Sequence, residues 1–165
     1  MPTELAFHFD ERRATQACAI LLKQAGGRSN YTRILKLIYL ADRKHIDATG
    51  NPITGATVVN MKNGPMLSEV YECIKGSRSS GVWDDHIANE GFDIRLTKPA
   101  GDSHISDLDV DILTELATRY ADASYSTMIE VVHDLPEWSD PAPAKVVPVA
   151  PADLLSCSWV QREGH

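Results

Sequence analysis

The sequence predicts a mainly α-helical α+β fold, with about five helices, a small antiparallel sheet or hairpin, and an irregular proline-rich C-terminal segment. Apolar residues recur at helical spacing in several segments, short β-branched stretches lie between them, and five of the nine prolines follow residue 135. The 165 residues, 43% hydrophobic and 24% charged, are typical of one globular domain. We expect a single domain over 1–165, with its motifs within about 10–160 and a wrapping tail at 136–165.

Caps and turn residues set the ends of the expected helices. The glycines at 26–27 end the first helix, and Asn30 is expected to cap the second. Gly64-Pro65 is expected to open the third helix, and Gly76 to stop it. We expect helices at 10 or 11–25, 30–48, 64–76, from 106 onward, and at about 126–133.

The expected strands are short. Residues 57–61 are β-branched and apolar, and residues 92–96 alternate apolar with polar side chains. Residues 104–106 are expected to form a brief return strand, and 77–91 to be irregular. From Pro136 onward we expect no regular structure until a turn of helix at 152–155.

The second expected helix is the most apolar, and its apolar residues cover more than one face. We therefore expect it to be central and largely buried. Its charged residues must then share one narrow exposed strip or pair with each other.

Charge and cysteine content exclude several classes of protein. The net charge is -7, and residues 81–165 carry 16 acidic against 5 basic residues, whereas residues 1–80 carry 7 against 11. An acidic chain is a poor general binder of nucleic acid, and the acidic half suits a basic protein partner. Three widely spaced cysteines favour a reducing cytoplasm, and no apolar run is long enough to cross a membrane.

No catalytic residue, metal or cofactor is expected. The sequence has no nucleophile elbow, phosphate-binding loop or dinucleotide fingerprint, and its histidines lack zinc-binding spacing. Asp84, Asp85 and His86 could coordinate a cation, but a polar loop also explains them. A metal-dependent hydrolase using these three residues is therefore kept only as an alternative.

Residues 62–71 are a candidate recognition surface. A Gly-Pro pair at a helix start leaves backbone N–H groups pointing outward, with Ser68 and Glu69 beside them. Such a surface suits an acidic side chain or a chain terminus. An ordinary strand-to-helix turn is the alternative interpretation.

Three ordered blocks together resemble the SocA-like antitoxin family, also called the Panacea domain. They read KLIYLADRKH at 36–45, GNPITG at 50–55 and MKNGPMLSEVY at 61–71, and HDLPEW at 133–138 is similar to the closing block of the family. The resemblance is dense over about 31–74 and weaker from 106 to about 155. Nothing in 77–105 matches.

The resemblance implies a non-enzymatic bacterial or prophage protein that neutralises a co-encoded toxin by binding it, and some relatives look like adaptors that deliver the toxin to a protease. Exposed charges near a structured turn are the better candidates for contact. The expected partner-binding residues are Asp42, Arg43, Lys62, Asn63, Ser68 and Glu69. The expected structural residues are Tyr39, Gly64, Pro65, Tyr71, His133 and Trp138.

The antitoxin interpretation gives one testable expectation for the partner. Replacing Glu69 and Arg43 with alanine should weaken toxin binding without unfolding the domain.

The alternative function is a transcriptional regulator of its own operon that contacts operator DNA. Its basic strip would consist of Arg28, Arg33, Lys36, Arg43 and Lys44. DNA is the less favoured partner, because several of these residues share a helix with the apolar core.

Overall fold

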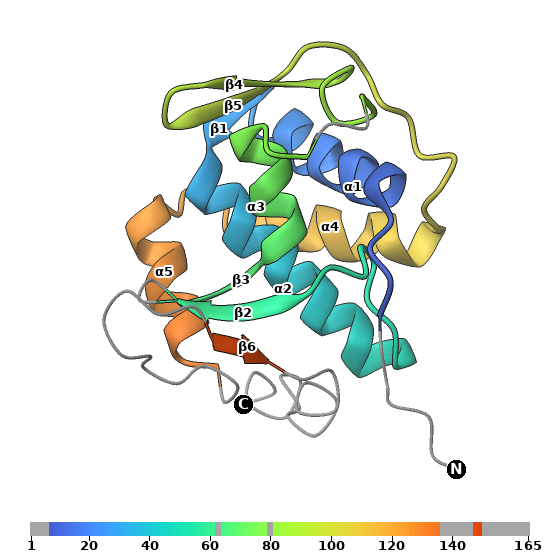
Figure 1. The fold of residues 1–165 in the computed structure, drawn as a ribbon. Coiled ribbons are helices and arrows are strands. Elements are labelled where there is room, and N and C mark those ends of the chain that lie inside the picture. The colour runs from blue at the N-terminus through green and yellow to red at the C-terminus, as the bar shows by residue number, and fades with distance from the viewer. Residues whose placement is uncertain (1–6, 62–63, 79–80, 136–146, 150–165) are drawn as a thin grey trace.

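The computed structural model describes residues 7–61, 64–78, 81–135 and 147–149. Within these residues, two three-stranded antiparallel sheets lie at opposite ends of a group of helices, and α2 runs through the middle (Figure 1). The helices are α1 (Glu11–Gln24), α2 (Tyr31–Thr49), α3 (Ser68–Lys75), α4 (Asp107–Arg119) and α5 (Tyr125–His133). The strands are β1 (Arg28–Asn30), β2 (Val58–Met61), β3 (Gly64–Leu67), β4 (Ile87–Glu90), β5 (Asp93–Leu96) and β6 (Val147–Val149). The predicted fold class is confirmed.

Side-chain caps fix where the helices begin. The Asp10 carboxylate accepts a hydrogen bond from the Arg13 amide at 3.1 Å, and Asn30 Oδ1 accepts one from the Thr32 amide at 2.9 Å. Ser106 caps α4 through a capping box. The cap predicted at Asn30 and the helix start predicted at residue 106 are confirmed.

Helix α2 is the centre of the core, as its apolar composition predicted. Its residues Ile34, Leu37, Ile38 and Leu40 are all fully buried. It packs against α1, α4 and α5 and against β3. Because α2 is surrounded on several sides, its charged side chains are also drawn into the interior.

One sheet has the strand order β1-β5-β4. Strand β5 confirms the strand predicted at 92–96, but its partners β1 and β4 were not predicted, since three or four residues are too few to show a period. The return strand predicted at 104–106 is wrong. The His104 amide donates instead to Gln16 Oε1 at 2.8 Å, so this segment is bound to α1 as a turn.

The second sheet has the order β3-β2-β6 and corrects the predicted start of the third helix. Gly64 and Pro65 belong to β3, where Pro65 lies opposite Asn60, and α3 begins only at Ser68. Gly64 has a φ of 103°, which no helix residue adopts. Proline is tolerated here because β3 is an edge strand.

Strand β6 corrects the prediction that regular structure is absent between 136 and 151. Val147 to Val149 pair antiparallel with β2, and Pro148 lies opposite Val59. This is again an edge position, where a missing N–H costs little. The helical turn predicted at 152–155 lies outside the described residues.

Candidate binding surface

Asp42 is a buried organiser of the loop that follows α2. One carboxylate oxygen accepts from the amides of Ile53 and Thr54, both at 3.0 Å, and the other accepts from the Thr54 hydroxyl at 2.5 Å. Burial raises the pKa of Asp42 to about 6, although these hydrogen bonds oppose the rise. Only 2% of Asp42 is exposed, so the prediction of an exposed contact residue at this position is wrong.

Arg43 is also buried, with an exposed fraction of 0%. Its guanidinium Nη1 lies 3.7 Å from the carboxylate of Asp47, one turn further along α2. The expectation that this charge is exposed is therefore wrong, because the helix is covered on the side that carries it. Replacing Arg43 with alanine would remove a large core side chain, so the double substitution with Glu69 cannot be expected to leave the fold intact.

A second buried carboxylate joins three helices. Asp109 of α4 accepts from Arg13 Nη2 of α1 at 2.9 Å and lies 2.8 Å from Nε2 of His45 in α2. It also accepts from the Ser106 amide at 2.9 Å. Sequence reasoning missed this cluster, because Arg13, His45 and Asp109 are 32 to 96 positions apart in the chain.

The glycine-proline block contacts α2 and α5. Lys36 Nζ donates to the Pro65 carbonyl at 3.2 Å, and burial lowers the pKa of Lys36 to about 8. A Cβ added at Gly64 would lie 2.7 Å from Val132 and 3.0 Å from the His133 ring. Three blocks that are far apart in the sequence therefore meet at β3. Tyr39 is fully buried on the same helix as Lys36.

The remaining predicted residues lie at the start of α3 or outside the described structure. The carboxylate of Glu69 accepts from the Thr57 amide at 2.8 Å and from its hydroxyl at 3.0 Å, which ties α3 to the segment before β2. Ser68 is half-buried at the first position of α3, where its amide donates to the Thr57 carbonyl. Lys62, Asn63 and Trp138 lie outside the described residues.

The predicted helix start with outward-pointing backbone N–H groups at Gly64-Pro65 is not formed, because these residues form a buried strand. Of the predicted contact residues that the structure describes, only Ser68 and Glu69 reach the surface. The part of the predicted contact region that a partner can reach therefore lies along α3.

An aromatic and cationic cluster lies on the exposed side of α3. Lys75 Nζ donates to the Tyr31 hydroxyl at 3.1 Å and lies 4.5 Å from the Tyr31 ring centre and 5.6 Å from that of Tyr71. The hydrogen bond to Tyr31 raises the pKa of Lys75. We call Tyr31, Tyr71, Lys75 and the neighbouring Phe92 the α3 face.

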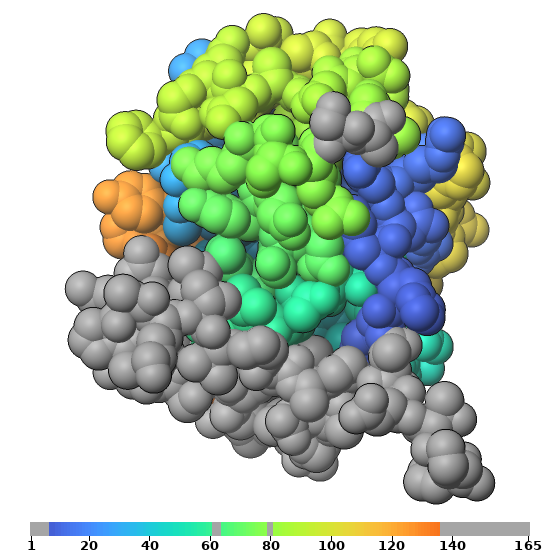
Figure 2. Space-filling model, in the orientation of Figure 1, coloured from blue at the N-terminus to red at the C-terminus, as the bar shows by residue number. Residues whose placement is uncertain are grey.

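Phe92 extends the α3 face onto the hairpin between β4 and β5. Its carbonyl accepts from the Tyr31 amide at 2.9 Å, and 78% of the residue is exposed. Figure 2 shows α3 at the centre of this side of the molecule, with the hairpin directly above it. Sequence reasoning identified Tyr71 but assigned it a structural role. It missed the other three, which come from three separate segments.

The basic strip proposed for DNA binding is not formed. Arg33, Lys36 and Arg43 are buried. Arg33 donates to the carbonyls of Ala123 and Tyr120, both at 2.9 Å. The two outer members are paired with acidic residues: Arg28 with Glu90 and Asp93, and Lys44 with Glu115.

The cysteines and acidic residues of the described chain do not form a metal site. Cys18 and Cys73 are free and buried, and burial raises the pKa of both, that of Cys73 to about 12. Among the described residues, no three His, Cys, Asp or Glu side chains lie close enough together to hold a metal ion, the group at 84–86 included.

The fold and the sequence motifs thus define a mainly helical domain. The sequence blocks that contain Lys36, Gly64 and His133 meet beside the buried, charge-bearing helix α2. The chain matches the family described as "Antitoxin SocA-like, Panacea domain" over residues 34–139, and it belongs to that family. Searches with the chain found no significant match among curated proteins or solved structures. Within the described residues, no helix is long and apolar enough to span a membrane.

Proposed function

We propose that this chain is the antitoxin of a bacterial or prophage toxin–antitoxin pair, and that it acts in the cytoplasm by binding its toxin rather than by catalysis. Membership of the SocA-like antitoxin family supports the general role. The observation that carries the proposed mode of action is the α3 face, which presents aromatic and cationic side chains to the surface next to the family's own sequence block.

The α3 face has the composition of a protein-binding surface. Tyrosine and phenylalanine are enriched at the centres of interfaces, because a large rigid side chain loses little conformational entropy when it is covered. The contacts of Lys75 hold Tyr31 and Tyr71 in place before any partner arrives. An arrangement that is already ordered lowers the entropic cost of binding.

The test is co-expression with the product of the neighbouring gene, followed by co-purification and a titration of toxin activity. Replacing both Tyr71 and Lys75 with alanine should weaken toxin binding at least about tenfold, because both contribute to the centre of the α3 face. Inhibition that is complete at a fixed molar ratio indicates sequestration. An antitoxin that inactivated its toxin catalytically would need far less than one equivalent.

The matched control replaces Tyr125 and Lys98 with alanine. Tyr125 is 51% exposed on α5 and Lys98 is exposed on the loop after β5, so the same two side-chain types are removed outside the α3 face. The control should bind like the unaltered chain. Equal affinity of both variants would remove the α3 face from the interface while leaving the antitoxin role open to other surfaces.

The same experiment separates sequestration from delivery to a protease. Growth rescue together with a stable complex supports sequestration. Growth rescue with a shortened toxin half-life, lost in a strain without the responsible protease, supports an adaptor role. A neighbouring product that is not toxic would remove the main support for the proposal.

A further inference from the structure

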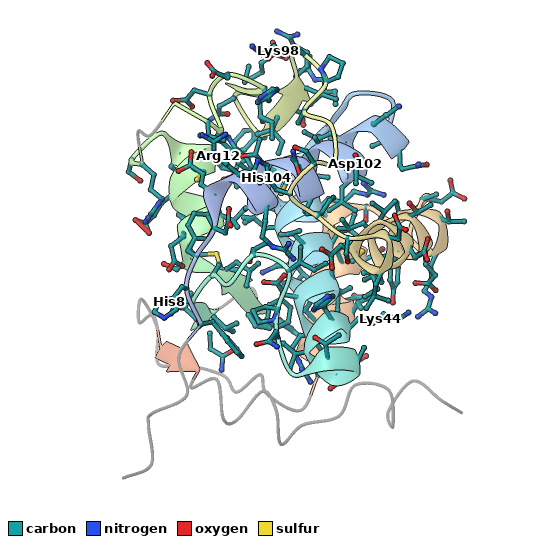
Figure 3. All side chains as sticks on the ribbon, turned by 90° about the vertical axis from the view of Figure 1, so that its right-hand side faces the viewer. His8, Arg12, Lys44, Lys98, Asp102 and His104 are labelled. Atoms are coloured by element: carbon teal, nitrogen blue, oxygen red, sulfur yellow. The ribbon has the colours of Figure 1, made fainter. Side chains whose placement is uncertain are left out.

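A small polar pocket lies between α1, the turn before β4 and the loop before α4. Its volume is about 170 Å³. Figure 3 shows two of its residues, Arg12 and His104, next to each other on the side of the molecule that this view turns toward the reader. The polar side chains that line the pocket are those of Arg12, Thr15, Gln16, His86, Ser103 and His104.

Two buried polar atoms of residues that line this pocket lack a hydrogen-bond partner among the described residues. Thr15 is 1% exposed, and its hydroxyl oxygen makes no hydrogen bond with the described residues. The same is true of Nδ1 of His86, which is also shielded from solvent. A buried hydroxyl without a partner is unfavourable, and each such group in a folded protein requires an explanation. A bound ligand that accepts hydrogen bonds would supply one.

The wall of the pocket is fixed by Gln16. Its side-chain amide donates to the Ala100 carbonyl at 3.2 Å and to the Ser103 hydroxyl at 3.1 Å, and its oxygen accepts from the His104 amide at 2.8 Å. The Arg13 guanidinium holds the same loop by donating to the His104 carbonyl at 2.6 Å. The pocket therefore keeps its shape without a ligand.

The chemistry of the lining selects an anion. Arg12 carries a permanent positive charge and makes no ion pair or hydrogen bond with the described residues. The hydroxyls of Thr15 and Ser103 can donate, and each histidine ring can donate in one tautomer or when protonated. No described carboxylate lines the pocket. The Glu11 carboxylate nearby accepts from the Trp83 amide instead.

We propose that this pocket binds a small oxyanion, either tetrahedral, such as inorganic phosphate, or the planar carboxylate of a small acid. The pocket volume of about 170 Å³ accommodates either group. This site is separate from the α3 face, so it goes beyond the antitoxin role and does not depend on it.

The test is a titration of the isotope-labelled full chain with sodium phosphate and, separately, with sodium acetate, followed by nuclear magnetic resonance. Sodium chloride at equal ionic strength is the salt control. Saturable shifts at the Thr15 amide and at the rings of His86 and His104 are expected with at least one of the two anions. The anion that binds more tightly distinguishes a tetrahedral from a planar ligand.

Two variants test the site and a third is their control. Thr15→Val keeps the shape of the side chain and removes the buried hydroxyl, and Arg12→Gln removes the charge. Each should weaken binding about tenfold, which is typical of losing one charge-assisted or buried hydrogen bond. Lys98→Gln makes the same charge change outside the lining and should leave affinity within about twofold. Absence of saturation with both anions, or equal weakening in all three variants, would overturn the proposal.

Discussion

Asp42 and Arg43 illustrate how a charged residue on a helix surface in the sequence becomes an internal residue in the fold. Asp42 satisfies two backbone amides and a hydroxyl of the loop after α2. The sequence predicted that the charges of this helix share a strip or pair with each other. Arg43 and Asp47 pair in that way. The partners of Asp42, Lys36 and Arg33 belong to other elements, and no helical period can reveal them.

Replacing Asp42 with alanine should lower the free energy of unfolding by about 2–4 kcal/mol, because the buried amides of Ile53 and Thr54 would lose their acceptor. Asp42→Asn keeps one oxygen for these amides and should cost about 1 kcal/mol. Urea denaturation of both variants measures the difference. If both variants are as stable as the original chain, the loop does not depend on Asp42.

Elements with clear local signals were predictable. Helices α1, α2 and α5 begin and end within one or two residues of the predicted positions, and α4 begins within one residue of its predicted start, because caps and apolar spacing are properties of neighbouring residues. The short strands β1, β4 and β6 were not, since each is stabilised by pairing with distant residues. The start of α3 was misplaced because Gly-Pro signals either a helix start or a strand turn.

Gly64 tests the contact between β3 and α5. An alanine there meets both an unfavourable φ of 103° and a Val132 methyl group 2.7 Å away. Gly64→Ala should therefore reduce the free energy of unfolding by about 2–4 kcal/mol. Gly76→Ala also has a positive φ, of 78°, but its Cβ would meet open space, so about 1 kcal/mol is expected. Equal losses in thermal denaturation would mean that α5 moves away without cost.

At the scale of the whole molecule, a net charge of -7 is combined with basic residues that, in the described part of the chain, are largely buried or paired. The charge imbalance of the sequence argued against DNA binding, but only the fold reveals that the candidate basic strip is divided between the core and ion pairs. Composition therefore argued against DNA binding, and the tertiary structure supplies the physical reason.

We accordingly expect no shift of the upstream DNA in a mobility-shift assay at micromolar protein and moderate salt, because phosphate neutralisation requires exposed cations. The complex with the purified toxin should be assayed alongside, since a toxin can contribute cations of its own. A sequence-specific shift with the chain alone would restore the regulator hypothesis.

The burial of the charges on α2 has a consequence for how this protein can change over generations. Under the proposed function, the residues that fold the chain and those that bind the partner are largely different sets. Most charges of α2 are buried, whereas Lys75 and Phe92 are exposed, and Tyr71 belongs both to a shared block and to the α3 face. Two chains that share the inward set share a scaffold, whichever partner each one binds. New specificity can then arise by exchange of a few surface residues, and a library built for that purpose should vary Tyr71, Lys75 and Phe92 and hold the buried residues of α2 constant.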